Sequence, residues 1–465
     1  MILAAGGYYF GYYVGIMNPL GTPLAKDVYD LKTKTQVDEF NGNVNFYFCI
    51  GTFIACFIAG ILADAVGRIR VIMLTEVLCF VTSYLYTVQN LNVLYAVRFV
   101  SGLVTGMIAG VVPVALAEMF PPAISGFGGL FFYLCLTGFI LLGWFSPIFC
   151  GNNQPSLVSH STFILAWPAV VGALRLGLIA FFFKFGGIES PGFFLKKLNL
   201  DDEDSVESTS ERLRQWYRTV YTEKDTELMI LNNINKQRET RNEVKPTLSA
   251  MFSTRYRFRF ITGCLINILQ QFSGVNFLVI FSTNLFNRIS NNGATMTLVI
   301  GAANIGGGLL GLFTVEKFGR RFNLMFGSLV QAFGFILLVI GSTYSIGFLS
   351  VIAVLVYMTA FGMGMGGTLP IFCAEIIPAI GNGIANSAQW MTASIIVKVL
   401  PTLTTSLGPT VLLLFFITVS FFNVFFVNYT CVETKGLSMD EVETVYLGGI
   451  TKSKSEQNFL VSRIF

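Results

Sequence analysis

Side-chain amides gather within one apolar stretch of the sequence. Gln270 and Gln271 stand in the segment QQFSGVN (270–276). Asn276 follows them by about one and a half helical turns. An amide carries donors and acceptors without net charge, so burying it in an apolar environment costs far less than burying an ionised group. Such a cluster suits hydrogen bonding to the hydroxyl groups of a small polar solute. Hydrogen bonding between helices is the alternative.

Three further residues are candidates for the same site. They are Asn304, Gln389 and Trp390, which lie in other apolar stretches. The amides would extend the set of hydrogen-bonding groups, and the indole would stack on the apolar face of a sugar ring. For Asn304, as for the two glutamines, a hydrogen bond between helices is the alternative.

A second set of candidate residues is charged and repeats along the chain. Three segments of the first half have counterparts in the second half at a nearly constant spacing: GILADAVGR with VEKFGRR, PVALAEMFP with PIFCAEIIP, and IESPG with VETKG. An acid recurs in each pair, and the first pair also shares Gly-Arg. The matched segments indicate a duplicated unit whose two copies are related by an axis along the membrane normal.

The repeated charges predict a gating cluster where helices end. We expect acids and arginines to pair across the two copies when the inner mouth is closed, and to separate when it opens. The alternative is a topology signal, in which Arg holds loops on one side and Gly makes the turns. The predicted cluster consists of Asp64, Arg68, Arg98, Glu118, Glu189, Glu316, Arg320, Arg321, Glu375 and Glu433.

Only a bundle of membrane helices positions both sets of residues. The 465 residues are 54% apolar and only 12% charged, whereas soluble domains are roughly a quarter charged. Twelve stretches are long enough to cross the hydrocarbon, near residues 2–20, 44–62, 70–88, 92–117, 126–150, 163–185, 258–282, 294–315, 322–341, 346–373, 383–404 and 409–430. We therefore predict an all-α membrane protein with twelve transmembrane helices in two pseudo-symmetric six-helix bundles.

The chain divides into four predicted segments. They are an N-terminal bundle (1–195), a cytoplasmic linker with short amphipathic helices (196–256), a C-terminal bundle (257–447) and a polar tail (448–465). A plain solvated linker is the alternative for the second segment. The Arg-rich loops place both termini and the linker in the cytoplasm. The first residues lack a basic leader, so we expect a first span and not a cleaved signal.

Other chemistries are disfavoured by what the sequence lacks. Its eight cysteines have neither metal-ligand nor CxxC spacing, and His160 is the one histidine, so no metal site is predicted. Catalytic and nucleotide-binding motifs and basic nucleic-acid patches are missing as well, so we predict neither an enzyme nor a cofactor. Glu76, Arg175 and Lys398 fall within apolar stretches, where a charge is costly unless it is paired or hydrated.

The chain resembles the sugar porters of the major facilitator superfamily, which include glucose facilitators and proton–sugar symporters. The resemblance covers residues 5–446 and rests on FGYYVGIMNP in the first span, GILADAVGR in loop 2–3, PVALAE after span 4, IESPGFFL (PESPR motif), QQFSGVN (QQxSGxN motif), EKFGRR in loop 8–9 and VETKG (PETKG motif). It implies a substrate site at mid-membrane that includes Gln270, Gln271, Asn276, Asn304 and Trp390, and alternating access by rocking of the bundles.

Several positions depart from the family pattern. Proton-coupled members carry an acid where this chain has Tyr13. Facilitated diffusion is therefore favoured, with Glu76 only a remote substitute. Tyr133 stands in place of the sugar-contacting glutamine of span 5, and we include it among the predicted substrate-binding residues. The remaining departures are Ile280-Phe281, Pro370, and three arginine positions of the inner cluster that are now Ser125, Gly192 and Asn382.

The retained amides favour facilitative transport (uniport) of a hexose or a related small polyhydroxylated solute by alternating access. The altered positions leave two alternatives open. One is a transport-inactive, transporter-like subunit with a structural or sensing role in a larger membrane assembly, and the other is a porter for another small polar solute. The expected partners are a sugar-like molecule and membrane lipid, and no nucleic acid. The predicted location is the plasma membrane or an organelle membrane.

Overall fold

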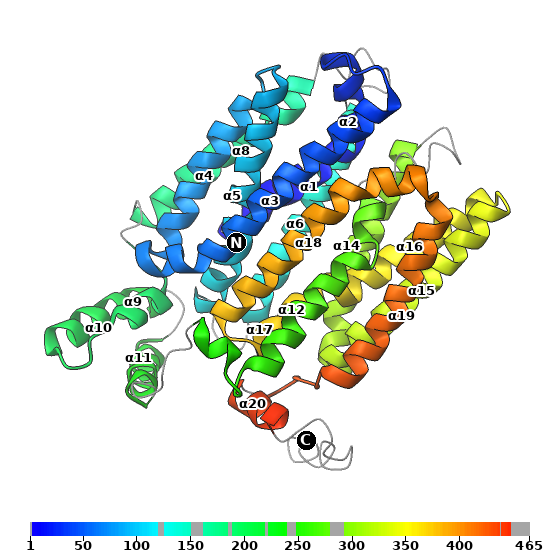
Figure 1. Cartoon of the computed structure of the whole chain (residues 1–465). Helices are drawn as coiled ribbons and strands as arrows, with labels where there is room; N and C mark the ends of the chain where they lie inside the picture. Colours follow the sequence, from blue (N-terminus) through cyan, green and yellow to red (C-terminus); the bar gives the residue numbers. More distant parts are fainter. Residues whose placement is uncertain are drawn as a thin grey trace.

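The structure, a computed structural model, describes residues 2–119, 125–149, 161–184, 188–218, 222–239, 248–279, 293–437 and 439–447 (Figure 1). Within these ranges the regular secondary structure is helical throughout. Most helices run along one common direction, as expected for a bundle that crosses a membrane (Figure 1).

The N-terminal half supplies the first six helical runs. Its first run is broken into short consecutive helices, whereas most of the others are long. The runs are α1 (Gly7–Gly15) continued by α2 (Met17–Pro23) and η2 (Leu24–Val28), then α3 (Lys34–Val66), α4 (Arg68–Leu85), α5 (Leu91–Met119), α6 (Ser125–Phe149) and the helical segment Ser161–Phe182, which contains α8 (Pro168–Phe182).

The C-terminal half supplies the other six. They are α12 (Arg257–Phe272) with a short helix at 275–279, α14 (Gly293–Phe318), α15 (Arg320–Thr343), α16 (Gly347–Phe361) continued by η7 (Gly362–Gly366) and α17 (Thr368–Ile376), α18 (Ala379–Ser406) and α19 (Pro409–Thr430). In the described ranges these runs correspond to the twelve predicted spans. Seven helices there qualify as membrane spans on length and composition alone.

Glycine and capping residues set the helix boundaries at the turns. Thr33 and Gln36 form a reciprocal capping box that starts α3 at Lys34, ahead of the apolar stretch. Gly67 (φ +116°) joins α3 to α4, and Gly319 (φ +92°) joins α14 to α15. A positive φ favours glycine strongly, which gives a conformational reason for glycine in both Gly-Arg segments.

Two spans of the C-terminal half are interrupted. Ser273 and Gly274 form a turn after α12, where Gly274 has φ +93°. The glycine-rich segment η7 separates α16 from α17 and lies close to α15. An added Cβ at Gly364 would lie 3.0 Å from the Cα of Gly327. Both interruptions occur beside residues of the candidate site.

Large apolar side chains cover the outside of the bundle. Phe181, Phe313 and Phe348 are 76–78% exposed, which is the arrangement expected for a surface in contact with lipid. Buried aromatic residues fill the interior of each half, among them Tyr12 in the N-terminal half and Phe335 in the C-terminal half.

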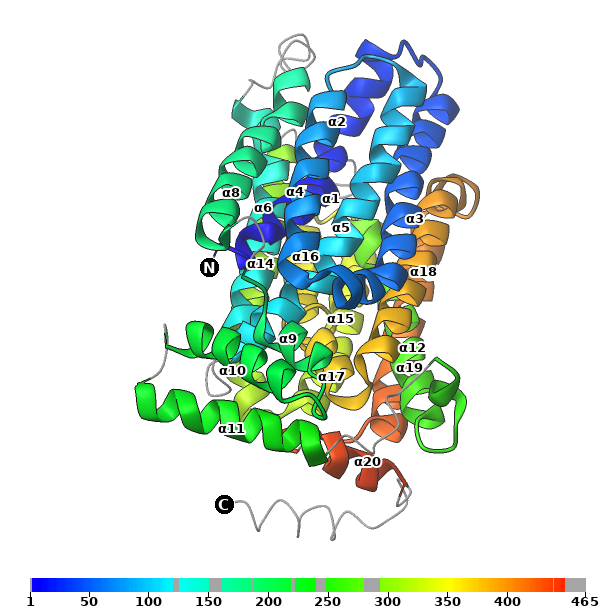
Figure 2. The ribbon, with the colours of Figure 1, turned by 90° about the vertical axis from the view of Figure 1, so that its left-hand side faces the viewer.

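The short polar helices lie together at one end of the bundle, called the inner end below because the charge distribution predicts that it faces the cytoplasm (Figure 2). They are α9 (Pro191–Lys197), α10 (Glu203–Tyr217), α11 (Glu223–Glu239) and α20 (Met439–Leu447). Leu213 of α10 packs with Ile230 and Ile234 of α11. The four segment boundaries stay predictions, and the tail 448–465 lies outside the described residues.

The two halves meet along two pairs of helices. α3 of the N-terminal half packs along α18 of the C-terminal half (Figure 1), and α6 packs along α14. The candidate site lies where these pairs meet the interrupted spans.

Candidate substrate site and inner charge clusters

The predicted amide residues of α12 and α18 form one chain of hydrogen bonds. Gln389 Nε2 donates to Gln270 Oε1 at 2.6 Å, and Gln271 Nε2 donates to the same oxygen at 3.2 Å. Asn276 Nδ2 donates to Gln271 Oε1 at 2.7 Å. Gln270 Nε2 in turn donates to the Met365 carbonyl of η7 at 2.6 Å. Gln270 therefore connects three separate segments of the C-terminal half.

The turn at Ser273-Gly274 brings Asn276 back toward the glutamines. In an uninterrupted helix, residues five apart do not share a face. The carbonyl of Ser273 accepts a hydrogen bond from Tyr357 Oη at 3.0 Å. An added Cβ at Gly274 would meet the ring of Phe335 at 2.7 Å. Gly274 in the sequence fits the positive φ of this turn, but nothing in the sequence indicates that Tyr357 supports it.

Asn304 and Tyr133 present buried polar atoms without a partner. In the described part of the chain, neither Asn304 Oδ1 nor Tyr133 Oη makes a hydrogen bond. Tyr133 lies across the interface between halves, where an added Cβ at Gly308 would be 2.3 Å from its ring. Asn304 lies against Gly362 of η7, and η7 also supplies the carbonyl that Gln270 binds. Buried polar atoms of this kind favour a polar ligand or water.

Trp390 faces aromatic residues of the other half. Its ring centroid lies 5.8 Å from that of Phe10 on α1 and 6.5 Å from that of Phe48 on α3. Gln389, the preceding residue of α18, points to Gln270 instead. Phe10 and Phe48 could not be predicted from the sequence, because single apolar residues in a span carry no distinguishing pattern.

The N-terminal half has a charge cluster at the inner end of α4 and α5. The guanidinium of Arg68, only 1% exposed, pairs with Asp64 at 2.9 Å and with Glu118 at 3.0 Å. Ser190 Oγ donates to Glu118 Oε2 at 2.5 Å, and Lys196 of α9 pairs with Asp64 at 2.7 Å. An added Cβ at Gly192 would lie 2.2 Å from the Glu118 carboxyl carbon. Glu118 therefore lies where a side chain at position 192 would begin.

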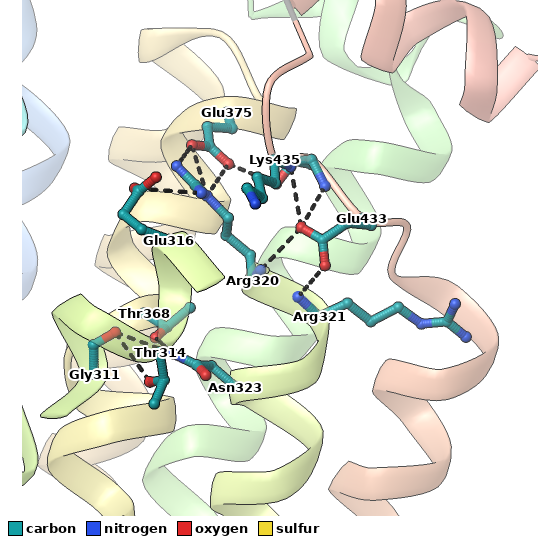
Figure 3. Close-up of polar contacts among 11 residues, drawn as sticks. Gly311, Thr314, Glu316, Arg320, Arg321, Asn323, Thr368, Glu375, Glu433 and Lys435 are labelled. Atoms are coloured by element: carbon teal, nitrogen blue, oxygen red, sulfur yellow. Dashed lines mark hydrogen bonds and ion pairs between the residues drawn. The ribbon is translucent and has the colours of Figure 1, made fainter. Parts of the chain in front are cut away.

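The C-terminal half repeats this cluster (Figure 3). Arg320 pairs with Glu375 at 2.9 Å and with Glu316 at 3.5 Å. Thr434 Oγ1 donates to Glu375 at 2.5 Å, which corresponds to the Ser190–Glu118 contact of the first half. Arg321 donates to the Asn428 carbonyl at 2.6 Å. The sequence repeat therefore corresponds to a structural repeat.

Glu189 and Glu433 cap the N-termini of two equivalent helices. Glu189 accepts hydrogen bonds from the backbone N–H groups of Ile69 (2.9 Å) and Arg70 (3.0 Å). Glu433 accepts from those of Arg320 (2.9 Å) and Arg321 (3.1 Å). A carboxylate is favourable at a helix N-terminus. Burial nevertheless raises the pKa of Glu189, and the backbone hydrogen bonds oppose that rise.

The charged residues of the two inner clusters pair locally in this structure. The ion pairs of Arg68 and of Arg320 join groups of the same half, and pairing across the halves in a state with a closed inner mouth stays a prediction. Helix ends within a half converge closely enough to supply Arg68 and Arg320 with local acids. Arg98 is not part of an inner cluster. It lies near the outer start of α5 and donates to the carbonyls of Tyr13 (2.9 Å) and Val44 (3.1 Å).

The charged residues within spans also have partners. Glu76 of α4 forms an ion pair with Arg175 of α8 and accepts a hydrogen bond from Tyr8 Oη at 3.2 Å. Arg175 also donates to the carbonyls of Ile2 and Leu3, each at 2.8 Å. All of these groups belong to the N-terminal half. Pairing reduces the cost of burying both charges.

Comparison with known proteins identifies the class to which this arrangement belongs. The fold is that of solved structures of XylE, a proton:xylose symporter of the major facilitator superfamily. A structure with bound 6-bromo-6-deoxy-D-glucose gives a TM-score of 0.80 at 19% identity, covering 96% of this chain and 98% of that one. An inward-open structure of XylE from E. coli gives 0.76 with the same coverage. The predicted fold of twelve transmembrane helices in two bundles is confirmed.

The family follows from the sequence match. Residues 1–446 match the family described as "Sugar (and other) transporter", and the chain belongs to that family. Similar curated proteins include Hexose transporter 1 of Toxoplasma gondii, 27% identical over 95% of this chain and 81% of the relative. Facilitated glucose transporter member 2 of Rattus norvegicus is 27% identical over 85% and 75%. The chain is therefore a multi-pass membrane transporter and not an enzyme.

Proposed function

We propose that the protein carries a hexose or a related small polyhydroxylated solute by facilitated diffusion. The observation that carries the proposal is the hydrogen-bonded chain of neutral amides from Gln389 through Gln270 to Asn276. A solute with several hydroxyls offers replacements for these mutual hydrogen bonds, so opening the amide chain for a ligand leaves few polar groups unpaired. Asn304 and Tyr133 add further polar atoms to the same region.

The residues around Tyr13 support uniport over proton coupling. The Tyr13 hydroxyl donates to the Leu165 carbonyl at 2.6 Å and lies within hydrogen-bond distance of the Ser83 hydroxyl, at 3.0 Å. A phenol in this position does not exchange a proton at neutral pH as a carboxyl does. The mid-span acid Glu76 forms an ion pair with Arg175 and a hydrogen bond with Tyr8, all within the N-terminal half. Neither group is therefore suited to carry a proton with the substrate.

Alternating access fits the way in which the halves meet. The N-terminal and C-terminal charge clusters each tie helix ends together inside one half. Each half is therefore expected to move as a unit. Sliding along α3/α18 and α6/α14 would then expose the amide chain to one side of the membrane at a time. In this proposal the charge clusters stiffen the two bodies and do not latch one to the other.

Uptake into proteoliposomes tests the proposed function. Purified protein should take up labelled glucose saturably, and Gln270→Ala should abolish the saturable part. A uniporter should also exchange labelled for unlabelled glucose without a pH gradient, and an imposed gradient should not raise the final accumulation. Accumulation above equilibrium driven by the gradient would contradict uniport.

The self-bonded amide chain also supports a second candidate, a transport-inactive structural or sensing subunit. In that case the amides would serve only to hold α12, η7 and α18 together. Stable co-purification with other membrane proteins, without exchange of any hexose, would support it. A porter for a different polar solute would instead show exchange with a polyol or another polyhydroxylated compound, again lost in Gln270→Ala.

A further inference from the structure

A groove on the lipid-facing surface lies between α3 and α5 in the outer part of the bundle. It has a volume of about 360 Å³ and is lined by Tyr47, Asn92, Tyr95, Ala96 and Phe99. Both α3 and α5 begin at the outer end of the bundle. The residues that line the groove therefore lie on the outer side of the membrane, away from the inner charge clusters. Aromatic rings and one amide are typical of the boundary between hydrocarbon and head groups.

Lys398 is a cation next to this groove. It lies on the exposed face of α18 together with Ile395 (52% exposed) and Val399 (42% exposed), which are lipid-facing side chains. Its ammonium donates to the Asn43 side chain of α3, a neutral partner. In the described residues no acid pairs with Lys398, whereas Arg68, Arg175 and Arg320 all pair with acids. A lipid-facing lysine can extend its ammonium toward the head groups, and without an acidic partner it is suited to bind a phosphate there.

Asn43 joins the cation to the groove. Asn43 and Tyr47 lie one turn apart on α3, and the Tyr95 ring lies 5.2 Å from that of Tyr47. The contacts from Lys398 through Asn43 therefore lead from α18 along α3 to the lining of the groove. A charged group and an apolar channel thus lie side by side on the membrane-facing surface.

We propose that a phospholipid of the outer leaflet binds here, with its phosphate at Lys398 and Asn43 and an acyl chain in the groove beside Ala96 and Phe99. The phosphate neutralises the charge of Lys398, which otherwise has only a neutral partner, and the acyl chain covers the exposed aromatic rings. Lys398 and Asn43 belong to different halves, and α3/α18 is one of the two helix pairs along which the halves mainly pack. The bound lipid therefore touches both bodies of the transporter.

Native mass spectrometry of the full-length protein tests the site directly. The probes are phosphatidylglycerol and a diacylglycerol with the same chains but no phosphate. The variants are Lys398→Gln and Ala96→Phe, with Lys32→Gln as the matched control because Lys32 is an exposed loop cation at the outer end. Lys398→Gln should lower phosphatidylglycerol retention about fivefold and leave diacylglycerol retention unchanged. Ala96→Phe should lower retention of both lipids, and Lys32→Gln of neither.

Two outcomes would overturn the assignment. Equal retention of phosphatidylglycerol by the wild-type protein, Lys398→Gln and Lys32→Gln would exclude the phosphate contact. If Lys398→Gln lowers lipid retention and Ala96→Phe does not, the groove is excluded as the binding site of the acyl chain. Both substituted side chains lie at exposed positions of helices, so the variants are expected to fold. The binding readout does not depend on transport, so it is distinct from the test of the proposed function.

Discussion

At the scale of single residues, Gln270 is the centre of the candidate site. Its side chain accepts two hydrogen bonds and donates one, which leaves each neighbouring amide dependent on it. Gln389 is at one end of the chain and makes a single bond to Gln270. The effect of a substitution on transport should therefore be larger at Gln270 than at Gln389.

Gln389→Leu should raise the KM for glucose exchange about threefold to tenfold, because one hydrogen bond to the solute or to Gln270 is lost. The measurement is the concentration dependence of exchange in proteoliposomes. Gln331→Leu is the matched control, because Gln331 is a fully buried amide of α15 that does not belong to the amide chain. An equal KM for Gln389→Leu and wild type would exclude Gln389 from the site.

At the scale of elements, two glycines allow α4 and α15 to begin directly under a carboxylate. Gly67 and Gly319 have positive φ, and a Cβ at either position would lie within 2.4 Å of a Glu189 or Glu433 oxygen. Backbone conformation and lack of space thus both select glycine. The capped N-terminus is a local feature that each half possesses independently.

Gly67→Ala should destabilise the protein by at least about 1 kcal/mol, since both the positive φ and the carboxylate contact oppose a Cβ. Thermal unfolding in detergent, followed by helical circular dichroism, measures the loss. Gly60→Ala is the matched control, because an added Cβ there meets nothing within 4 Å. A melting temperature for Gly67→Ala equal to that of the control would contradict the capping account.

Glu189 gives a pH dependence with a defined sign. Burial raises the pKa of its carboxyl in the folded protein. Its stabilising contribution is therefore present below the unfolded pKa, about 4.3, and is lost as pH rises through the folded value. The melting temperature of the wild type should fall relative to that of Glu189→Gln as pH rises from about 4 toward 7. Melting curves over that range measure the difference.

Glu227 serves as a control, because its effect on stability should depend on pH in the opposite direction. Its pKa is lowered by the hydrogen bond from Arg214. The wild type should therefore lose stability relative to Glu227→Gln as pH falls. The same trend in both variants would show that the pH effect arises elsewhere.

At the scale of the whole molecule, function depends on how closely two separate bundles approach each other. One close approach between the halves near the site is that of Gly308 on α14 to the ring of Tyr133 on α6, where an added Cβ would lie 2.3 Å from the ring. Parting of the halves relieves this contact, whereas a bulkier residue at 308 opposes its formation. The contact therefore reports on the closed state and not on folding of either half.

Gly308→Val should slow glucose exchange about tenfold without lowering the melting temperature, because a clash of this size costs 1–3 kcal/mol only when the halves close. Gly306→Val is the matched control on the same helix, since an added Cβ there meets nothing within 4 Å. Exchange rates and melting curves of both variants provide the measurement. Equal exchange by the two variants would contradict the role of the contact.

The sequence predicted the helices well, because long apolar stretches and glycine turns depend on local composition. It also predicted that Gln270, Gln271 and Gln389 gather, since all three are neutral amides within apolar stretches. It did not predict that the acid–Arg pairs stay within each half. Spacing along the chain tells which helix ends share a side of the membrane, but not which neighbour each charge meets. Ile280-Phe281 lies outside the described residues.

Confinement of the acid–Arg pairs to single bundles has an energetic consequence. Separating the bundles at the inner end breaks none of the ion pairs of Arg68 and Arg320. Dissolved ions would then have little attraction between the bundles to screen as the protein changes conformation. Exchange of an uncharged hexose should therefore vary by less than about twofold between low and high salt. A steep acceleration by salt would reveal electrostatic attraction between the two bodies.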